Sequence, residues 1–413
     1  MVHLRPLALI AIASLALSLA PRPTAADESP AFELKDGDRV VLLGGTFIDR
    51  EQHDGYIETG LVSRFPGRKI TFRNIGWDGD TVFEQHRPEN FGSMMEHLRR
   101  LRPTVLIASY GTMESERGVA DLVRFAARYN ELLENFAKTG ARIVLMSPFP
   151  REPGTDAAGA DEHNRSLAAY VSAIGRIAQQ RHLPFVDLSQ VLVHRKGNPP
   201  LWLTDNGVHL SALGYWRASP EVARGLGLPP TAWQLEVEGS KVKKASGTSV
   251  RSIEKRGGKL RFELLDAQLP SPPAPQPHPK TPLAWTPERT LQITGFAPGR
   301  YQLSIDGKPI ASGRHEAWRQ YPLVSGPEFE QAEQLRKAIV EKNELFFFRF
   351  RPHNGEYVYG RRSKTFSSNS GNEQFPAEMA KLDELIAAAD ARIAKLAIPV
   401  AHRYELVRID EAN

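Results

Sequence analysis

Four short segments of this chain place a hydroxyl, thioether, carboxylate, amide or imidazole group close to glycine. They are Gly44-Gly45-Thr46, residues 74–81 (Asn-Ile-Gly-Trp-Asp-Gly-Asp-Thr), residues 110–114 (Tyr-Gly-Thr-Met-Glu) and residues 204–209 (Thr-Asp-Asn-Gly-Val-His). A threonine hydroxyl can attack an ester carbonyl when a base removes its proton, and histidine is the side chain that most often acts as such a base. These residue types therefore allow acyl transfer if the fold brings the segments together.

The elements that must position these segments are visible between residues 31 and 229. Short apolar runs predict strands at 39–43, 69–74, 104–109, 142–147 and 184–187. Apolar residues at i, i+3 and i+4 predict a helix over 121–138 and another over 165–181. Strands that alternate with helices form a parallel sheet covered on both faces, and such sheets bind ligands at the carboxyl ends of their strands. Three of the four segments directly follow predicted strands, so chemistry is expected at that edge.

The order of the four segments on these strands resembles that of the SGNH/GDSL hydrolases, a family of esterases, over roughly residues 38–225. The resemblance implies an α/β domain with a flavodoxin-like three-layer α/β/α fold and a parallel sheet. It also implies that Thr46 stands in place of the nucleophilic serine. Gly79 would supply a backbone N–H to the oxyanion, and His209 would act as the base.

Three positions depart from the family pattern. Thr46 keeps a hydroxyl but adds a methyl group that restricts its rotamers. Met113 stands where the family has an asparagine donor in the oxyanion hole, and a thioether donates no hydrogen bond. Asn206 stands where the family has the aspartate that orients the histidine. An amide can orient the ring but cannot stabilise an imidazolium by charge, and Asp205 beside it is the candidate substitute.

The other histidines near these segments are interpreted as surface residues, the alternative for His53 and His86 being that they line the site. His53 and His86 follow the first and second segments, and His163 lies in residues 161–164 (Asp-Glu-His-Asn). An alternative for His163 is that of a substitute acid or base, or of a metal ligand together with its acidic neighbours. The sequence otherwise gives no sign of a metal or an organic cofactor.

Beyond residue 229 the pattern changes. Apolar residues alternate with polar ones around 235–237, 260–264, 291–293 and 301–305, and Asp306-Gly307 predicts a hairpin turn. The proline-rich run 269–279 predicts an exposed loop, so residues 230–320 are interpreted as a small β module. Residues 321–413 are expected to be a helical C-terminal region, with helices over 327–343 and 376–396. The aromatic and arginine residues of 346–352 are expected to pack under these helices, the alternative being a ligand surface.

The N-terminus predicts a signal peptide over residues 1–26. Arg5 precedes an apolar run over 7–20, and Thr24-Ala25-Ala26 forms a small-residue cleavage site before Asp27. The apolar run is shorter than the roughly 20 residues that a membrane span needs, although an uncleaved anchor is the alternative. The mature protein is expected to have no integral membrane segment and to be exported, periplasmic or extracellular.

Composition excludes several function classes. The chain has no cysteine, which excludes disulfides, thiolate metal sites and a cysteine nucleophile. The formal net charge is +5, and lysine and arginine gather between residues 241 and 261. Such a run could bind nucleic acid or an anionic wall polymer, but no nucleic-acid motif accompanies it, so a solvated basic face is predicted and no nucleic-acid partner is expected.

Two functions remain. The first is an exported hydrolase of small or carbohydrate acyl esters, in which Thr46 attacks and His209 is the base. The alternative is a catalytically inactive SGNH domain that keeps its pocket as a glycan- or protein-binding module. His209 and Gly79 favour the enzyme, whereas the changes at Thr46, Met113 and Asn206 favour the binding module.

Overall fold

The structure is a computed structural model that describes residues 32–87, 91–153, 157–192, 203–275, 288–351 and 377–409. The predicted signal peptide lies outside the described residues and stays a prediction. Within the described part, no helix combines the length and the apolar character that crossing a membrane requires.

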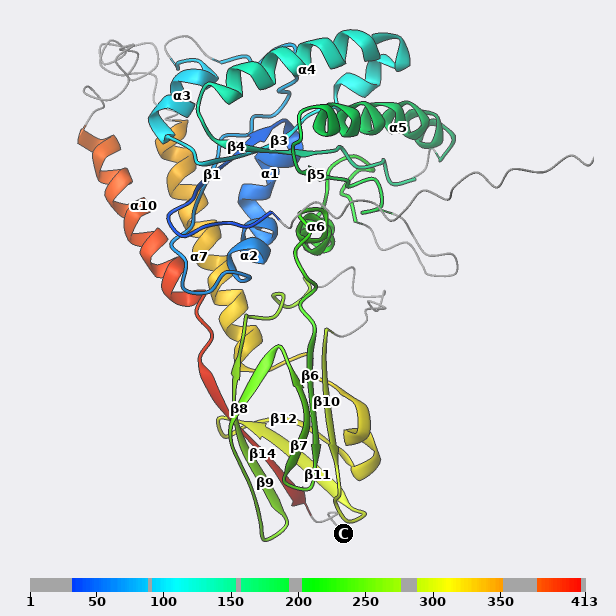
Figure 1. Cartoon of the computed structure of the whole chain (residues 1–413), viewed down its shortest axis with the longest axis vertical. Helices are drawn as coiled ribbons and strands as arrows, with labels where there is room; N and C mark the ends of the chain where they lie inside the picture. Colours follow the sequence, from blue (N-terminus) through cyan, green and yellow to red (C-terminus); the bar gives the residue numbers. More distant parts are fainter. Residues whose placement is uncertain are drawn as a thin grey trace, which may run out of the picture. The chain divides into compact units, whose positions relative to one another are not determined.

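Five parallel strands form the central sheet, in the order β2-β1-β3-β4-β5 (Figure 1). They are β1 (Arg39–Gly44), β2 (Thr71–Asn74), β3 (Val105–Ser109), β4 (Arg142–Met146) and β5 (Phe185–Val186). All five lie where the sequence predicts strands. Their order is that of flavodoxin-like folds, in which the chain reverses direction across the sheet at β1 and β3 and leaves a crevice at the carboxyl ends of these two strands.

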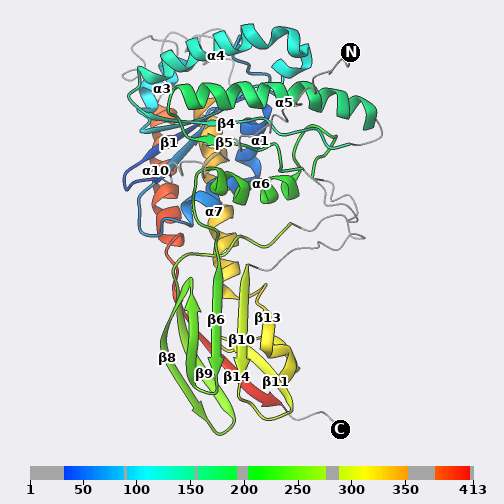
Figure 2. The ribbon, with the colours of Figure 1, turned by 45° about the vertical axis from the view of Figure 1, so that its right-hand side comes forward.

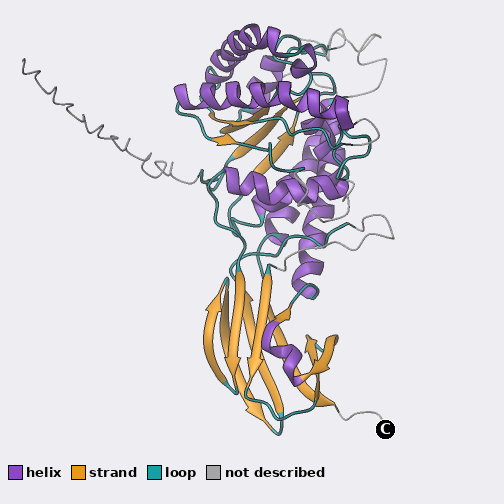
Figure 3. Cartoon of the chain, turned by 90° about the vertical axis from the view of Figure 1, so that its right-hand side faces the viewer, coloured by secondary structure: helices purple, strands orange, loops and turns teal. Residues whose placement is uncertain are grey.

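Helices cover both faces of this sheet, as Figure 2 and Figure 3 show. One layer holds α1 (Thr46–Asp54), α2 (Tyr56–Val62) and α6 (Ala212–Gly225), and the other holds α3 (Met94–Leu101), α4 (Leu122–Ala137) and α5 (Ala157–Gln180). Alternate residues of β1 divide between two cores: Val40 and Leu42 pack with the first layer, and Val41 and Leu43 with the second. The three-layer α/β/α prediction is therefore confirmed.

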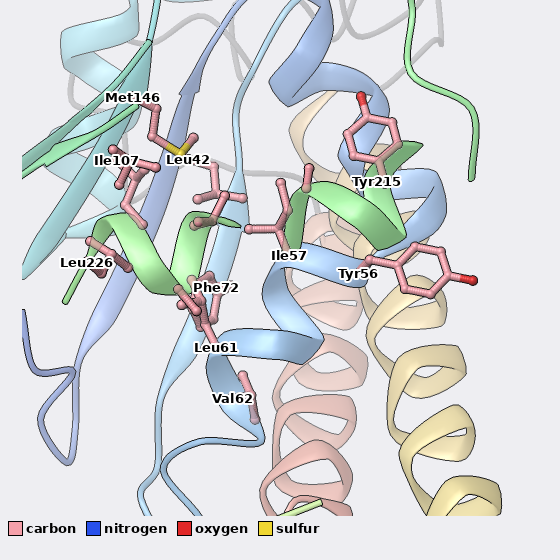
Figure 4. Close-up of a cluster of buried hydrophobic side chains, with 14 of the residues drawn as sticks. Leu42, Tyr56, Ile57, Leu61, Val62, Phe72, Ile107, Met146, Tyr215 and Leu226 are labelled. Carbon is pink, nitrogen blue, oxygen red and sulfur yellow. The ribbon is translucent and has the colours of Figure 1, made fainter. Parts of the chain in front are cut away.

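The first of these cores is drawn in Figure 4. Leu42, Phe72 and Ile107 of the sheet lie in the same core as Ile57 and Leu61 of α2, and all five are almost completely buried. Burying a large aliphatic or aromatic side chain contributes about 1.5–3 kcal/mol relative to leaving it exposed. The loops at the carboxyl edge thus start from a rigid, densely packed base.

Two further sheets follow, in the orders β13-β10-β6-β7 and β12-β11-β14-β9-β8. Their strands are β6 (Trp233–Glu238), β7 (Lys241–Ser246), β8 (Thr248–Arg256), β9 (Lys259–Asp266), β10 (Arg289–Thr294), β11 (Arg300–Ile305), β12 (Lys308–Arg314), β13 (Tyr321–Pro322) and β14 (Ala401–Ile409). The predicted turn at Asp306-Gly307 joins β11 to β12 with positive φ at both residues, as a type I′ hairpin requires.

The C-terminal region is helical as expected but also supplies a central strand. It contains α7 (Pro327–Phe350), α10 (Ala377–Leu396) and β14, which lies between β9 and β11. The sequence analysis missed β14, although His402, Tyr404 and Leu406 alternate with more exposed residues there. Strand β14 therefore completes a sheet that begins in the β module.

Helix α7 is longer than predicted. The helix expected to end at residue 343 continues through the aromatic run to Phe350, and Phe346 and Phe350 stack one turn apart with ring centroids separated by 5.7 Å. Both rings are buried, whereas Phe348 on the other side of the helix is 48% exposed. The run mainly supplies core packing, and helix position decides which rings are buried.

A buried histidine in α3 gives the fold a defined pH dependence. Burial, reinforced by the charge of Arg100, lowers the pKa of His97 to about 3. Its Nε2 lies 3.0 Å from the carbonyl oxygen of Phe91, so the neutral ring donates there. Because the pKa of His97 is lower in the folded state than its unfolded-state value of about 6.5, the neutral ring contributes fully to stability above about pH 6.5. This contribution is lost as the pH falls below that value.

We therefore expect His97 alone to reduce the free energy of unfolding by up to about 1.4 kcal/mol per pH unit between about pH 6 and pH 4. Urea unfolding at a series of pH values measures this slope. His97→Gln keeps a side-chain N–H donor without a group that titrates in this range, so the variant should lose less stability on acidification than the wild type. Equal slopes would show that the buried imidazole does not drive the effect.

Candidate active site

The turn between β1 and α1 presents Thr46 at the carboxyl edge of the sheet. A Cβ added to Gly44, whose φ is +148°, would lie 2.2 Å from the carbonyl oxygen of Ser109, and one added to Gly45 would lie 2.9 Å from that of Asp80. Both glycines are therefore needed for the turn to pack between the loops that follow β3 and β2. Thr46 begins α1, and within the described residues its backbone N–H has no acceptor.

The loop after β2 supplies both a carboxylate and a backbone donor. The N–H of Trp77 donates to the carbonyl oxygen of Gly44 at 2.9 Å, which holds this loop against the Thr46 turn. The hydroxyl of Thr46 donates to Oδ1 of the exposed Asp78. Gly79 follows with φ +80°, and in the described part of the chain its N–H has no acceptor either. This N–H is therefore available for its predicted role as an oxyanion donor.

Glu114 fixes the loop after β3. Its buried carboxylate accepts hydrogen bonds from the N–H groups of Val82, at 2.7 Å, and Gly111, at 2.9 Å, and so joins this loop to the one after β2. Burial raises the pKa of Glu114 above its ordinary value, against the effect of these hydrogen bonds. Met113 beside it is 48% exposed, so the thioether faces open space where an amide donor would stand.

A separate network fixes the loop that carries His209. The carboxylate of Glu152 accepts from both the N–H and the hydroxyl of Thr204, at 2.9 and 2.6 Å. Asn206 Oδ1 accepts from the N–H groups of Val208, at 3.1 Å, and His209, at 2.9 Å. The same side chain places Nδ2 3.2 Å from His209 Nδ1. Asn206 thus orients the imidazole, as the sequence analysis allows for an amide at this position.

Asp205 has a different partner from the imidazole. Its carboxylate lies 2.5 Å from Arg50 of α1, and both side chains are substantially exposed. This ion pair ties the His209 loop to α1. In the structure, Asp205 therefore does not take the place of the family carboxylate beside His209.

One pocket collects the four segments. It encloses about 530 Å³ of empty space, the part open to solvent included, and it is lined by residues 45–47, 109–114 and 208–210 together with Arg50, Asp80, Phe149 and Tyr215. Thr46, Met113 and His209 line it, whereas Gly79, Asp205 and Asn206 are not among its lining residues. Among the described residues the hydroxyl of Thr46 bonds Asp78, and no hydrogen bond joins it to His209.

Aromatic rings form one wall of this pocket. Phe47 stacks on Tyr215 with ring centroids 5.6 Å apart and meets Phe149 edge-on at 5.3 Å. The Tyr215 hydroxyl donates to the carbonyl oxygen of Phe47 at 2.7 Å, which fixes both rings. The pocket is therefore apolar on this side and polar at Thr46 and His209.

The remaining histidines lie apart from this group. His53 and His86 are exposed, and neither lines the pocket. His163 Nδ1 lies 3.6 Å from Glu116, and burial lowers its pKa. In the part of the chain that the structure describes, no three histidine, aspartate or glutamate side chains come together as a metal site would require.

Sequence reasoning missed Asp78 and Arg50. Asp78 directly precedes Gly79, and the loops after β1 and β2 are neighbours because these strands pair. Arg50 lies four residues after Thr46, hence one turn along α1. The signal for Asp78 depends on the strand order, whereas the signal for Arg50 is helix spacing alone.

A 2-1-3-4-5 parallel sheet with a hydroxyl and an imidazole at its carboxyl edge, beside backbone N–H groups that have no acceptor among the described residues, is the arrangement of an α/β hydrolase domain. Residues 34–217 match the model of the GDSL-like lipase/acylhydrolase family. This part of the chain is therefore a GDSL-like lipase/acylhydrolase domain, as the four segments predict.

Solved structures with a similar fold include BT4096, described as a gut microbial diltiazem-metabolizing enzyme, with 19% identity and a TM-score of 0.66 over 91% of this chain and 99% of that chain. LAE5, an α/β hydrolase from the metagenome of Lake Arreo, Spain, has 18% identity and a TM-score of 0.38 over 47% of this chain and 97% of its own. A catalytic mutant of Axe2, an acetylxylan esterase from Geobacillus stearothermophilus, has 20% identity and a TM-score of 0.38 over 48% and 97%. No curated protein sequence matches the chain.

Proposed function

We propose that this protein hydrolyses small acyl esters and that Thr46 is the nucleophile. The observation that carries the proposal is that Thr46 and His209 line the same pocket. The backbone N–H groups of Thr46 and Gly79 have no acceptor among the described residues, so both are free to stabilise an oxyanion. The threonine methyl group restricts the approach of the substrate but leaves the hydroxyl available.

The pocket lining supports a substrate with one apolar group. The rings of Phe47, Phe149 and Tyr215 offer an apolar wall against which such a group can pack. The similarity to BT4096, described as metabolizing the small molecule diltiazem, also favours a small organic ester. Acylated carbohydrates, which the family resemblance implies, are the second substrate class in the same test.

Hydrolysis of p-nitrophenyl acetate and of a panel of acetylated sugars by the purified protein tests this function. Thr46→Ala removes the nucleophile and is expected to reduce kcat/KM at least about 1,000-fold, because members of one catalytic unit each cost that much or more. His209→Ala is expected to reduce it at least about 100-fold. His53→Ala is the matched control: it removes an exposed histidine outside the pocket and should leave the rate unchanged.

The outcomes separate the enzyme from a binding module. A rate that survives Thr46→Ala would exclude this residue as nucleophile, and a fluorophosphonate adduct on Thr46, located by mass spectrometry, would support it. If the wild type hydrolyses no ester of the panel, the pocket is that of a glycan- or protein-binding module, and binding to a glycan array would then be measured.

We also propose that the protein acts after export. The charged start, the apolar run and the small-residue site before Asp27 support this proposal. N-terminal sequencing of the protein from fractionated cells tests it, because export with cleavage gives a chain that begins at Asp27. A full-length chain confined to the cytoplasm would contradict it.

A further inference from the structure

The hydrogen bonds of Asn206 fix which way its amide faces. Oδ1 accepts from two backbone N–H groups, those of Val208 and His209, at 3.1 and 2.9 Å. Rotating the amide by half a turn would point Nδ2, which can only donate, at these two donors. Nδ2 must therefore face Nδ1 of His209, from which it is 3.2 Å away.

This orientation determines the tautomer of His209. Because Nδ2 of Asn206 donates, Nδ1 of the ring must accept and carries no proton. The neutral imidazole then carries its proton on Nε2. An aspartate at position 206 would select the opposite tautomer, in which Nε2 is the proton acceptor that a base needs, and an asparagine in such a position costs a serine-protease triad about 10⁴ in turnover for this reason.

The hydroxyl of Thr46 already has another acceptor. It donates to the carboxylate of Asp78, which is exposed on the loop after β2 and whose neighbour Gly79 is the predicted oxyanion donor. A carboxylate within hydrogen-bond reach of a nucleophile meets the geometric requirement for a general base. The two groups therefore have complementary roles. The imidazole of His209 offers Nε2–H as a donor, and the carboxylate of Asp78 is placed to accept the proton of the nucleophile.

We propose that Asp78 is the catalytic base of this site and that His209 acts in it as an Nε2–H donor. The inference rests on the proposed esterase function and states which group accepts the proton of its nucleophile. As Thr46 Oγ1 forms a bond to the acyl carbon, its proton passes to Asp78. The ester C–O bond breaks, and the alcohol leaves with that proton. Water then attacks the acyl carbon of the acyl-threonine and gives one proton to Asp78. The bond between that carbon and Oγ1 breaks, Asp78 returns the proton to Oγ1, and the acid is released.

A rescue experiment tests this assignment. Asp78→Asn keeps an oxygen that accepts the Thr46 hydroxyl but cannot take its proton, so kcat should fall at least about 100-fold. Adding Asn206→Asp gives His209 a carboxylate partner, turns Nε2 into an acceptor and should recover at least about tenfold of the loss. Asn206→Ala in the same background is the matched control, because it removes the amide without adding a carboxylate and should recover nothing.

The tautomer of His209 can be determined without an activity assay. Long-range ¹H–¹⁵N spectra of the wild type distinguish protonated from bare ring nitrogens, and the His209→Ala spectrum identifies the signals of His209. A proton on Nε2 supports the proposal, and a proton on Nδ1 overturns it. Undiminished turnover in Asp78→Asn also overturns it. A wild type that hydrolyses no ester refutes the proposed function instead, and the spectrum still decides the role of His209.

Discussion

Replacing Met113 with asparagine is expected to raise kcat about 100- to 1,000-fold. One oxyanion-hole donor contributes about 10²–10³ to turnover in hydrolases, and Met113 lines the pocket at the position where the family carries an asparagine donor. The side chain is 48% exposed, and Glu114 holds the adjacent backbone through hydrogen bonds to Val82 and Gly111. The exchange therefore changes the chemistry of the pocket without disturbing its frame.

Initial rates with p-nitrophenyl acetate measure the effect, and Met113→Leu is the matched control. Leucine has a similar volume and no donor, so its rate should stay within about threefold of the wild type. A gain in kcat with little change in KM would show that the new donor stabilises the transition state and not the bound substrate. If asparagine and leucine behave alike, the reacting oxygen does not lie beside position 113.

The sheet could be predicted because its strands are buried on both faces. Residues 39–43 and 104–109 read as continuous apolar runs, and β1 and β3 lie there with every interior residue buried. The end of α7 could not be predicted in the same way. Aromatic residues are moderate helix formers, so the run from Phe346 resembles a strand or loop until the stacking of Phe346 on Phe350 is known.

The sequence predicts which segments form the site, but it does not predict the hydrogen-bond partners or the positions of the protons within it. The glycines at 44 and 45, before Thr46, indicate close loop packing, and the structure brings the four segments to the same edge of the sheet. Spacing alone cannot tell that Asp205 pairs with Arg50 while Asp78 accepts from Thr46. These partners depend on side-chain direction at the ends of neighbouring strands. The tautomer of His209 depends further on two backbone N–H groups in its own loop.

Helix α7 is joined to the hydrolase domain by a buried ion pair. Lys342 Nζ is 2.9 Å from Glu58 of α2, and it also donates to the carbonyl oxygen of Phe72, at 3.1 Å, and to Asn343 Oδ1, at 2.6 Å. Lys342 is fully buried and Glu58 almost so. Burial raises the pKa of Glu58 and lowers that of Lys342, so each charge depends on the other to remain ionised.

Replacing Lys342 with methionine is expected to lower the free energy of unfolding by about 3–5 kcal/mol, because the carboxylate of Glu58 then stays buried without its partner. Urea unfolding near neutral pH measures the loss. Lys337→Met on the same helix is the matched control. Its side chain is 65% exposed and lies 4.0 Å from Glu333, and such a surface pair contributes at most about 1 kcal/mol.

The double variant Lys342→Met with Glu58→Leu distinguishes the buried charge from a simple loss of packing. Removing both charged groups leaves no uncompensated ion, so the double variant should be more stable than Lys342→Met alone although it carries one substitution more. If the double variant is instead the less stable of the two, the methionine disrupts the packing of α7 against α2 and β2. The pair would then be incidental to the attachment of this helix, and the hydrophobic residues Leu335 and Ile339 would hold it to the sheet layer.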